Sequence, residues 1–226
     1  MKKAPFIKLI AIVFTICFLL PNLSKAQKGT SFGFKVGPEF STRAYFGGMN
    51  HFATPQLGFS LQGHAQFQLN THLGLDIGLG YGLKRYKDSF TSVYQIRADW
   101  PPHVTTLSYK TILRSIELPV LLKYFFGDEK MGLYAGIGVT PTLFFRTVIN
   151  DWDVINPYDH IDYPDHQVYN SLQLKIAPQL AIGVRRPLNE QFDLNLELYG
   201  NIVPWHLFWG NDVFLINSGV RVGLWL

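Results

Sequence analysis

The stretch from His72 to Lys84 alternates between apolar positions and positions that hold glycine or a charge. Leucine, isoleucine and tyrosine fall on every second position, and glycines with Asp76 lie between them. Side chains of an extended chain point alternately to opposite faces, so this period of two predicts a strand with one apolar face. The other face, mostly glycine with an occasional charge, fits a crowded polar interior. We therefore expect the leucines to face an apolar medium.

The same alternation recurs along the chain, and helical periodicity is missing beyond residue 26. The eight alternating runs cover residues 31–40, 56–69, 72–87, 109–126, 131–147, 170–186, 191–203 and 213–226. Short breaks lie near 70–71, 127–130 and 187–190, and longer breaks lie at 41–55, 88–108, 148–169 and 204–212. Short periplasmic turns and longer external loops are typical of outer-membrane barrels. The pattern predicts an all-β fold, an eight-stranded antiparallel up-and-down transmembrane β-barrel.

Aromatic residues on the apolar faces gather near the two ends of these runs. The group near the short turns is Phe32, Phe67, Tyr124, Phe126 and Phe192, and the group near the long loops is Phe40, Phe59, Tyr81, Phe145 and Phe214. Two such belts are expected where a barrel crosses both interfaces of a bilayer.

Three prolines lie inside the runs, at Pro119, Pro141 and Pro178. Each removes one hydrogen bond from the ladder, and we expect each to mark a β-bulge.

The first 26 residues resemble a cleavable secretory signal. Lys2 and Lys3 precede an apolar run from Leu9 to Leu20, and a polar stretch ends at Ala26. That run is shorter than the roughly 20 residues that a spanning helix needs. The expected division is therefore a signal peptide at 1–26 and one barrel domain at 27–226, which places the protein in the outer membrane.

Removal of this segment changes the charge and the thiol content. The chain has 20 Lys and Arg against 16 Asp and Glu, and four of the lysines lie in residues 1–26. The mature protein is then formally neutral, so its charge gives no reason to expect a nucleic-acid partner. Cys17 also lies in the segment, and the rest of the chain has no cysteine for disulfides or thiolate metal sites.

Two internal segments and the closing strand carry a family resemblance. The segments are Ser115–Tyr124, which reads SIELPVLLKY, and Gly132–Gly138, which reads GLYAGIG. Together they resemble the outer-membrane β-barrel domain of the PorT-like porin family of Bacteroidota, over most of residues 29–226. The last strand also resembles the assembly signal of such barrels, through Asn217, Gly219, Val222 and Leu224. The resemblance implies contact with the barrel-insertion machinery and a part in protein secretion or gliding.

Charged residues on the polar faces are the main candidates for chemistry. Those expected to form a lumen charge network are Lys35, Asp76, Glu117, Lys123, Arg185, Asp193, Glu197 and Arg221. The 187–190 turn places Arg185 opposite Asp193, and Arg221 neighbours Glu197. An eight-stranded barrel is only just wide enough for its own side chains, and paired charges are tolerable there. We expect these residues to plug the lumen.

Three further cations, Lys84, Arg146 and Lys175, lie toward the long loops on the polar faces, without evident acidic partners. They suggest a weak attraction for anions at that end. The 148–169 loop carries Asp151, Asp153, Asp159, His160, Asp162, Asp165 and His166, whose spacing matches no metal motif. No nucleophile elbow or His-Glu metal motif appears either. We expect no cofactor, no metal and no catalysis.

The sequence favours an outer-membrane barrel in a structural or surface-interaction role. The lipid bilayer is one expected partner, and the external loops offer a surface for another. Aromatic residues in or beside these loops support such a surface: Trp100, Trp152, Tyr158, Tyr163, Trp205 and Trp209. A small-solute porin is the first alternative, and a soluble periplasmic lipocalin-like binder with its apolar face inward is the second.

Overall fold

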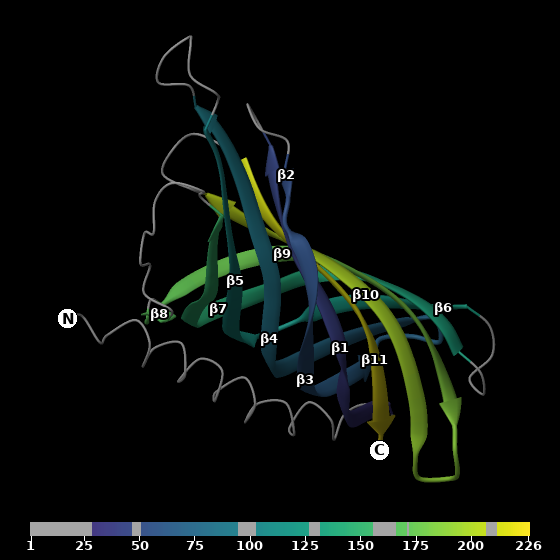
Figure 1. Cartoon of the computed structure of the whole chain (residues 1–226). Coiled ribbons are helices and arrows are strands. Elements are labelled where there is room, and N and C mark those ends of the chain that lie inside the picture. The colour runs from purple at the N-terminus through teal and green to yellow at the C-terminus, as the bar shows by residue number, and fades with distance from the viewer. Residues whose placement is uncertain are drawn as a thin grey trace.

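The computed structural model describes residues 29–46, 51–94, 103–126, 132–155, 166–170, 172–206 and 212–226 (Figure 1). The expected signal segment 1–26 lies outside these residues. The strands are β1 (Thr30–Phe46), β2 (His51–Phe52), β3 (Thr54–Gln68), β4 (Leu73–Tyr94), β5 (His103–Glu117), β6 (Val120–Phe126), β7 (Gly132–Ile155), β8 (His166–Tyr169), β9 (Gln173–Pro187), β10 (Asp193–His206) and β11 (Asp212–Trp225). No helix within the described ranges is long and apolar enough to cross a membrane.

The strands form one antiparallel sheet that closes on itself. Its order is β11-β10-β9-β7-β5-β4-β3-β1, and β11 also pairs with β1. Figure 1 shows these two strands side by side near the C-terminus. At the seam, Leu226 N donates to Phe32 O at 2.7 Å, and Phe32 N donates to Leu226 O at 3.2 Å. An antiparallel up-and-down barrel is therefore confirmed.

The structure divides the sheet into more segments than the eight expected strands. β5 and β6 both lie between β4 and β7, and Leu118 and Pro119 separate them, so the two segments share one place in the barrel. Two further segments, β2 and β8, are short and pair with β1 and β7. The eight alternating runs correspond to the eight remaining places around the ring.

The prolines do not mark bulges. The register shifts lie at Gln56/Phe59, Ser108/Lys110 and Arg114/Ser115. Pro141 pairs with Ile176 in an unbroken ladder, and Pro178 pairs with Val139. A proline loses only its N–H, and the carbonyls remain usable: Leu118 N donates to Pro141 O at 2.9 Å. The expectation of bulges at these positions is wrong.

The strands also extend into the segments expected to be long loops. β4 continues to Tyr94 and β7 to Ile155, while β5 already begins at His103. The ladder continues there although the alternation is lost, because strand pairing needs only backbone groups. Alternation requires two different media, and beyond the membrane both faces meet polar or protein surroundings.

Two of the short turns are closed in the same way by an asparagine side chain. Asn70 Oδ1 accepts hydrogen bonds from the backbone N–H groups of His72 and Leu73, both at 2.8 Å. Asn189 Oδ1 accepts from Gln191 N at 2.9 Å and Phe192 N at 2.8 Å. Such side-chain bonds to nearby backbone are a local property of asparagine, and they fix these turns.

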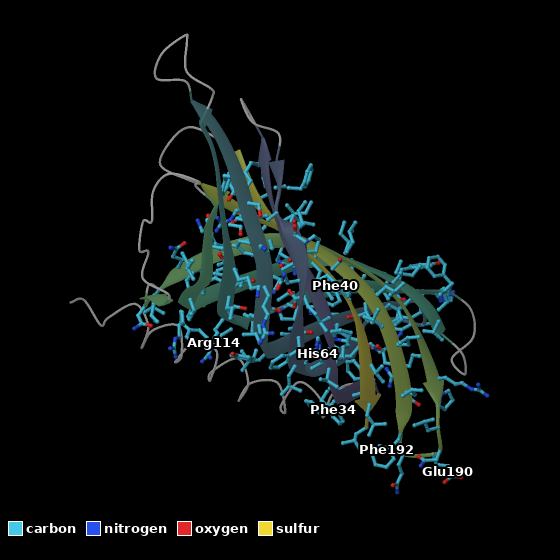
Figure 2. All side chains as sticks on the ribbon, viewed as in Figure 1. Phe34, Phe40, His64, Arg114, Glu190 and Phe192 are labelled. Carbon is cyan, nitrogen blue, oxygen red and sulfur yellow. The ribbon has the colours of Figure 1, made fainter. Side chains whose placement is uncertain are left out.

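The apolar face of the barrel points outward. Phe34 and Phe40, labelled in Figure 2, are each 50% exposed, and Ile137 on β7 is 62% exposed. The intervening residues on each strand are buried, and many of them are polar or charged. This arrangement is the reverse of a lipocalin, whose apolar face lines the interior, so that alternative is wrong.

The interior changes character along the barrel. Polar and charged side chains fill the part nearer the short turns. Toward the long loops, Tyr86, Leu113, Phe144, Val203 and Leu215 form a buried apolar cluster with Ala53 and Ala177. The outer part of the barrel therefore contains an apolar cluster together with the ion pair between buried Asp88 and the partly exposed Arg43.

Candidate functional site: the charged interior

Eight charged side chains fill the polar part of the interior, and none is more than 1% exposed. A ninth buried charge, Asp88, lies nearer the long loops and forms an ion pair with Arg43. Of the eight, four are cations (Lys35, Lys84, Lys123 and Arg221) and four are carboxylates (Glu39, Asp76, Glu117 and Glu197). Their formal charges cancel. Buried charges are tolerated only when they are paired and hydrogen-bonded, so the contacts among these groups determine what the interior can do.

The periplasmic cluster consists of Lys35, Lys123, Asp76 and Glu197. Lys35 Nζ lies 3.1 Å from Asp76 Oδ2 and 2.8 Å from Glu197 Oε2. Lys123 Nζ approaches the same two oxygens, at 2.5 Å and 3.5 Å. The four residues come from β1, β6, β4 and β10, so the cluster connects opposite walls of the barrel.

Neutral side chains complete the hydrogen bonds of this cluster. Tyr134 donates its hydroxyl proton to Glu197 Oε2 at 2.7 Å, and Asn195 Nδ2 donates to the Tyr134 oxygen at 3.0 Å. His64 Nδ1 lies 2.8 Å from Asp76 Oδ1, so a proton lies between these two atoms. Both carboxylates thus have neutral partners as well as cations.

The central cluster consists of Glu39, Lys84, Glu117 and Arg221. Lys84 forms ion pairs with Glu39 and with Glu117, the latter at 2.6 Å. Tyr199 donates to Glu39 Oε2 at 2.9 Å. Lys84 therefore has two buried acidic partners, and the expectation that it lacks one is wrong.

A glutamine and a histidine connect the two clusters. Gln62 Nε2 donates to Glu117 Oε2 at 3.0 Å, which leaves its Oε1 atom as an acceptor. That oxygen lies 3.0 Å from His64 Nε2. A continuous chain of contacts runs from Glu117 through Gln62 and His64 to Asp76.

Arg221 on β11 provides a second connection. Its Nε atom donates to Ser60 Oγ at 3.1 Å, and its guanidinium carbon lies 3.3 Å from the centroid of the Tyr199 ring. Its Nη1 atom lies 3.6 Å from Glu197 Oε1. The planar guanidinium stacks on an aromatic face and contacts a carboxylate at its edge, a combination that lysine cannot reproduce.

Trp225 lies inside the barrel at its periplasmic end and is fully buried. The centroid of its ring is 5.5 Å from both Lys35 Nζ and Lys123 Nζ, and 5.3 Å from the guanidinium carbon of Arg185. Cations at this distance are attracted by the ring quadrupole. The indole thus lies next to the charged clusters where the barrel opens to the periplasmic side.

Arg185 and Asp193 form a separate pair at the periplasmic rim. Arg185 donates from Nε to Asp193 Oδ2 at 2.7 Å, and its Nη2 atom lies 2.6 Å from the same oxygen. These side chains are 20% and 29% exposed, so water reaches them. The structure brings the other six predicted residues together in the interior and leaves this pair at the edge.

The prediction missed several members of the interior. Glu39 was not singled out, although it lies four positions after Lys35 and so shares its face of an extended strand. His64 was not singled out either. The roles of Tyr134, Tyr199 and Trp225 depend on which strands face each other across the ring, and no local sequence pattern contains that information.

Arg146 does not point into the lumen. The register of β5 and β7 shifts next to it, so that Arg114 pairs with Arg146 while Ser115 pairs with Phe144. The extra residue, Phe145, exchanges the two faces, as a bulge does. Residues directly opposite share a face, which places Arg146 outside with Arg114. Lys175 pairs with buried Thr142 and keeps the expected inward side.

The expected assembly residues all lie on β11. Asn217 is buried and its Nδ2 atom donates to Asn201 Oδ1 at 2.7 Å. Gly219 pairs with Glu39 across the seam, and Val222, 47% exposed, is on the outer face. Leu224 pairs with Phe34. Their role in assembly remains a prediction.

Most of the acidic loop lies outside the residues that the structure describes. Asp159, His160, Asp162 and Asp165 fall outside the described residues, as do Trp100, Tyr158, Tyr163 and Trp209. Asp151 and Asp153 belong to β7, and His166 to β8. Across the described ranges, no group of three or more His, Cys, Asp or Glu side chains is arranged to hold a metal ion.

The closed antiparallel ring, its apolar outer face and its charged interior define a transmembrane β-barrel. Residues 24–204 match the family described as "Outer membrane protein beta-barrel domain". The chain belongs to this family, and its location is the outer membrane. No curated protein matches the chain significantly.

The solved structures to which the chain is similar include three outer-membrane proteins. Neisserial surface protein A is 15% identical, with a TM-score of 0.45, and the match covers 88% of this chain and 99% of that one. OprG from Pseudomonas aeruginosa is 13% identical, with a TM-score of 0.43 and coverage of 88% and 97%. The outer membrane protease OmpT from Escherichia coli is 11% identical, with a TM-score of 0.39 and coverage of 88% and 96%.

Proposed function

We propose that this protein is a non-catalytic outer-membrane barrel with a structural or surface-interaction role, whose lumen is plugged by its own charged side chains. The observation that supports this proposal is the balanced set of eight buried charges. Contacts between strands that are not neighbours, such as Lys123 with Glu197, place these side chains across the path that a solute would follow.

The energetic reason for a closed lumen is the cost of separating buried partners. An ion or solute that passes must part Lys35 and Lys123 from Asp76 and Glu197. Leaving a buried charge without its partner costs about 3–5 kcal/mol. At least two such pairs obstruct the passage, one in each cluster. The lumen therefore stays closed without a separate plug domain.

The same burial supports the absence of catalysis. A catalytic acid, base or nucleophile has to reach its substrate within hydrogen-bonding distance. The interior carboxylates are at most 1% exposed and already contact lysine or arginine. Substrates have no access to them from either end of the barrel.

Several finer features belong to the same proposal. Residues 1–26 would direct export and be removed, and residues 27–226 would form the barrel domain. The insertion machinery would read Asn217, Gly219, Val222 and Leu224 on the last strand. The SIELPVLLKY segment and GLYAGIG segment support kinship with the PorT-like proteins of Bacteroidota, and a surface or secretion partner would bind the external loops. Nucleic acid is not an expected partner.

Conductance in planar lipid bilayers tests the proposal. The mature protein is expected to give no current steps. A variant with Arg221→Ala and Trp225→Ala is expected to conduct, because it removes the two largest fully buried side chains. The double variant also shows that inserted barrels are detectable in the assay. Regular current steps from the unmodified protein would overturn the proposal and favour a small-solute channel.

A further inference from the structure

A group of arginines and lysines lies on the outer wall of the barrel, apart from the charged interior. Arg85 and Lys87 follow Leu83 on the outward face of β4, at the two next outward positions. Arg114 precedes half-exposed Ile116 on β5 by two residues and so shares its face. Arg146 joins them from β7 (Arg114 is labelled in Figure 2).

The strand register brings these cations close together. Arg114 lies directly opposite Arg146 on the neighbouring strand. It also lies opposite Leu83, which makes Arg85 its diagonal neighbour on β4. Directly opposed residues have Cβ atoms roughly 5 Å apart, and diagonal neighbours lie roughly 7–8 Å apart. The three guanidinium groups can therefore reach one ligand.

This arrangement is unfavourable for the barrel alone. Like charges directly opposite each other destabilise a sheet. In the described ranges, no carboxylate lies within ion-pair distance of Arg85, Lys87, Arg114 or Arg146. The Nε atoms of Arg114 and Arg146 are also buried without a hydrogen-bond partner. The repulsion between the opposed cations would be relieved by an anion with several acceptor oxygens.

The position of the group on the barrel indicates the source of that anion. Leu83, Ile116 and Phe145 precede the arginines, counted from the short turns, on the outward face of these three strands, and Ile112 on β5 and Val148 on β7 lie just beyond them. Near the same level, other strands present Thr42, Gln56, Leu172 and Pro204. The positive charge is thus confined to one side, at the boundary between lipid tails and headgroups.

We propose that Arg85, Arg114 and Arg146, assisted by Lys87, bind the phosphate of an anionic lipid in the outer leaflet. Guanidinium groups match phosphate oxygens with two parallel hydrogen bonds each. The acyl chains of the same lipid pack on Leu83 and Ile116, directly below the arginines. A lipid satisfies both the polar and the apolar part of this surface, whereas free phosphate satisfies only the first.

Native mass spectrometry of the mature barrel in a zwitterionic detergent tests the proposal. Phosphatidylglycerol is expected to remain bound, and phosphatidylcholine with the same acyl chains is expected to dissociate. Combining Arg85→Gln, Arg114→Gln and Arg146→Gln is expected to weaken phosphatidylglycerol binding roughly 100-fold. Arg186→Gln, which removes an exposed cation from β9 near the periplasmic turn, is the matched control and should bind as the unmodified protein does.

A charge reversal separates lipid binding from a structural role. Arg114→Glu creates an opposite-charge pair with Arg146 and is expected to keep or raise the resistance of the barrel to heat. The same variant should lose phosphatidylglycerol. Undiminished lipid binding by this variant or by the triple variant would overturn the proposal. Displacement of the lipid by millimolar inorganic phosphate would overturn it too, because the site would then recognise phosphate alone.

Discussion

An ion pair between Lys123 on β6 and Glu197 on β10 crosses the inside of the barrel, with 3.5 Å between Nζ and Oε2. The two strands are separated by β7 and β9 around the ring. The pair therefore forms only when the ring has closed, which links the burial of these charges to the completed barrel.

Replacing Lys123 by methionine is expected to destabilise the barrel by about 3–5 kcal/mol, because Asp76 and Glu197 lose a buried cation that they share. Urea unfolding of the refolded protein in lipid vesicles, followed by tryptophan fluorescence, measures the effect. Arg186→Gln, an exposed change, should stay within about 0.5 kcal/mol. Equal unfolding curves for the two variants would contradict the role given to the network.

Removal of a single hydroxyl tests the network more gently. Tyr134→Phe deletes the donor to Glu197 at 2.7 Å and should cost about 1.5–3 kcal/mol, since the bond is buried and its acceptor is charged. Tyr81→Phe is the matched control, because Tyr81 lies on the outward face of β4. That change should stay within about 0.5 kcal/mol. Equal losses of stability from the two changes would show that the buried hydrogen bond of Tyr134 contributes no more than an outward-facing tyrosine hydroxyl.

Because the apolar face meets lipid, the cost of placing an arginine on it should depend on depth in the membrane and not only on the exposure of the replaced side chain. Leu79 on β4 and Leu69 at a short turn are almost equally exposed, at 50% and 53%. Leu79→Arg should nevertheless cost about 2–4 kcal/mol because it lies near the middle of the apolar band, and Leu69→Arg about 0–1 kcal/mol. Unfolding in vesicles of defined thickness measures both. Similar costs at the two sites would contradict the assignment of Leu79 to the middle of the lipid-facing band.

Glycine is required where the backbone of a neighbouring strand leaves no room for a side chain. A Cβ atom added to Gly138 would collide with the backbone carbonyl of Val120, next to the interruption between β5 and β6. Gly138→Ala should therefore cost about 1–3 kcal/mol. At Gly63 the nearest atom to an added Cβ is 4.0 Å away, so Gly63→Ala should be tolerated. The temperature at which the folded band disappears on gel electrophoresis compares them, and a lower value for Gly63→Ala would contradict this reading.

Local alternation was sufficient to predict the barrel class, because each run reports which face meets lipid. It also predicted the contact of Arg185 with Asp193, although the register differs from the expected one: Arg185 lies opposite Asn195, so the ion pair is diagonal. Local alternation did not predict the contact of Lys84 with Glu39, because β1 and β4 are separated by β3 and their side chains meet only through the curvature of the sheet.

Two other errors have different physical origins. A single extra residue, Phe145, moved Arg146 to the outer face, and nothing in the local composition distinguishes a bulge from regular alternation. The long loops were overestimated because backbone pairing continues where the contrast between the two faces ends. These errors affect the outer third of the barrel, where the environment no longer imposes a pattern on the sequence.

The apolar cluster around Tyr86, Leu113 and Phe144 fills the inside of the barrel at the level of Arg85. From Arg85, at the lipid boundary, β4 continues without interruption to Tyr94. With about 3.4 Å per residue and a tilt of about 45°, this segment raises the loop bases roughly 20 Å above the headgroups. A binding partner would thus meet the loops at a distance above the membrane that is set by the length of the paired strands.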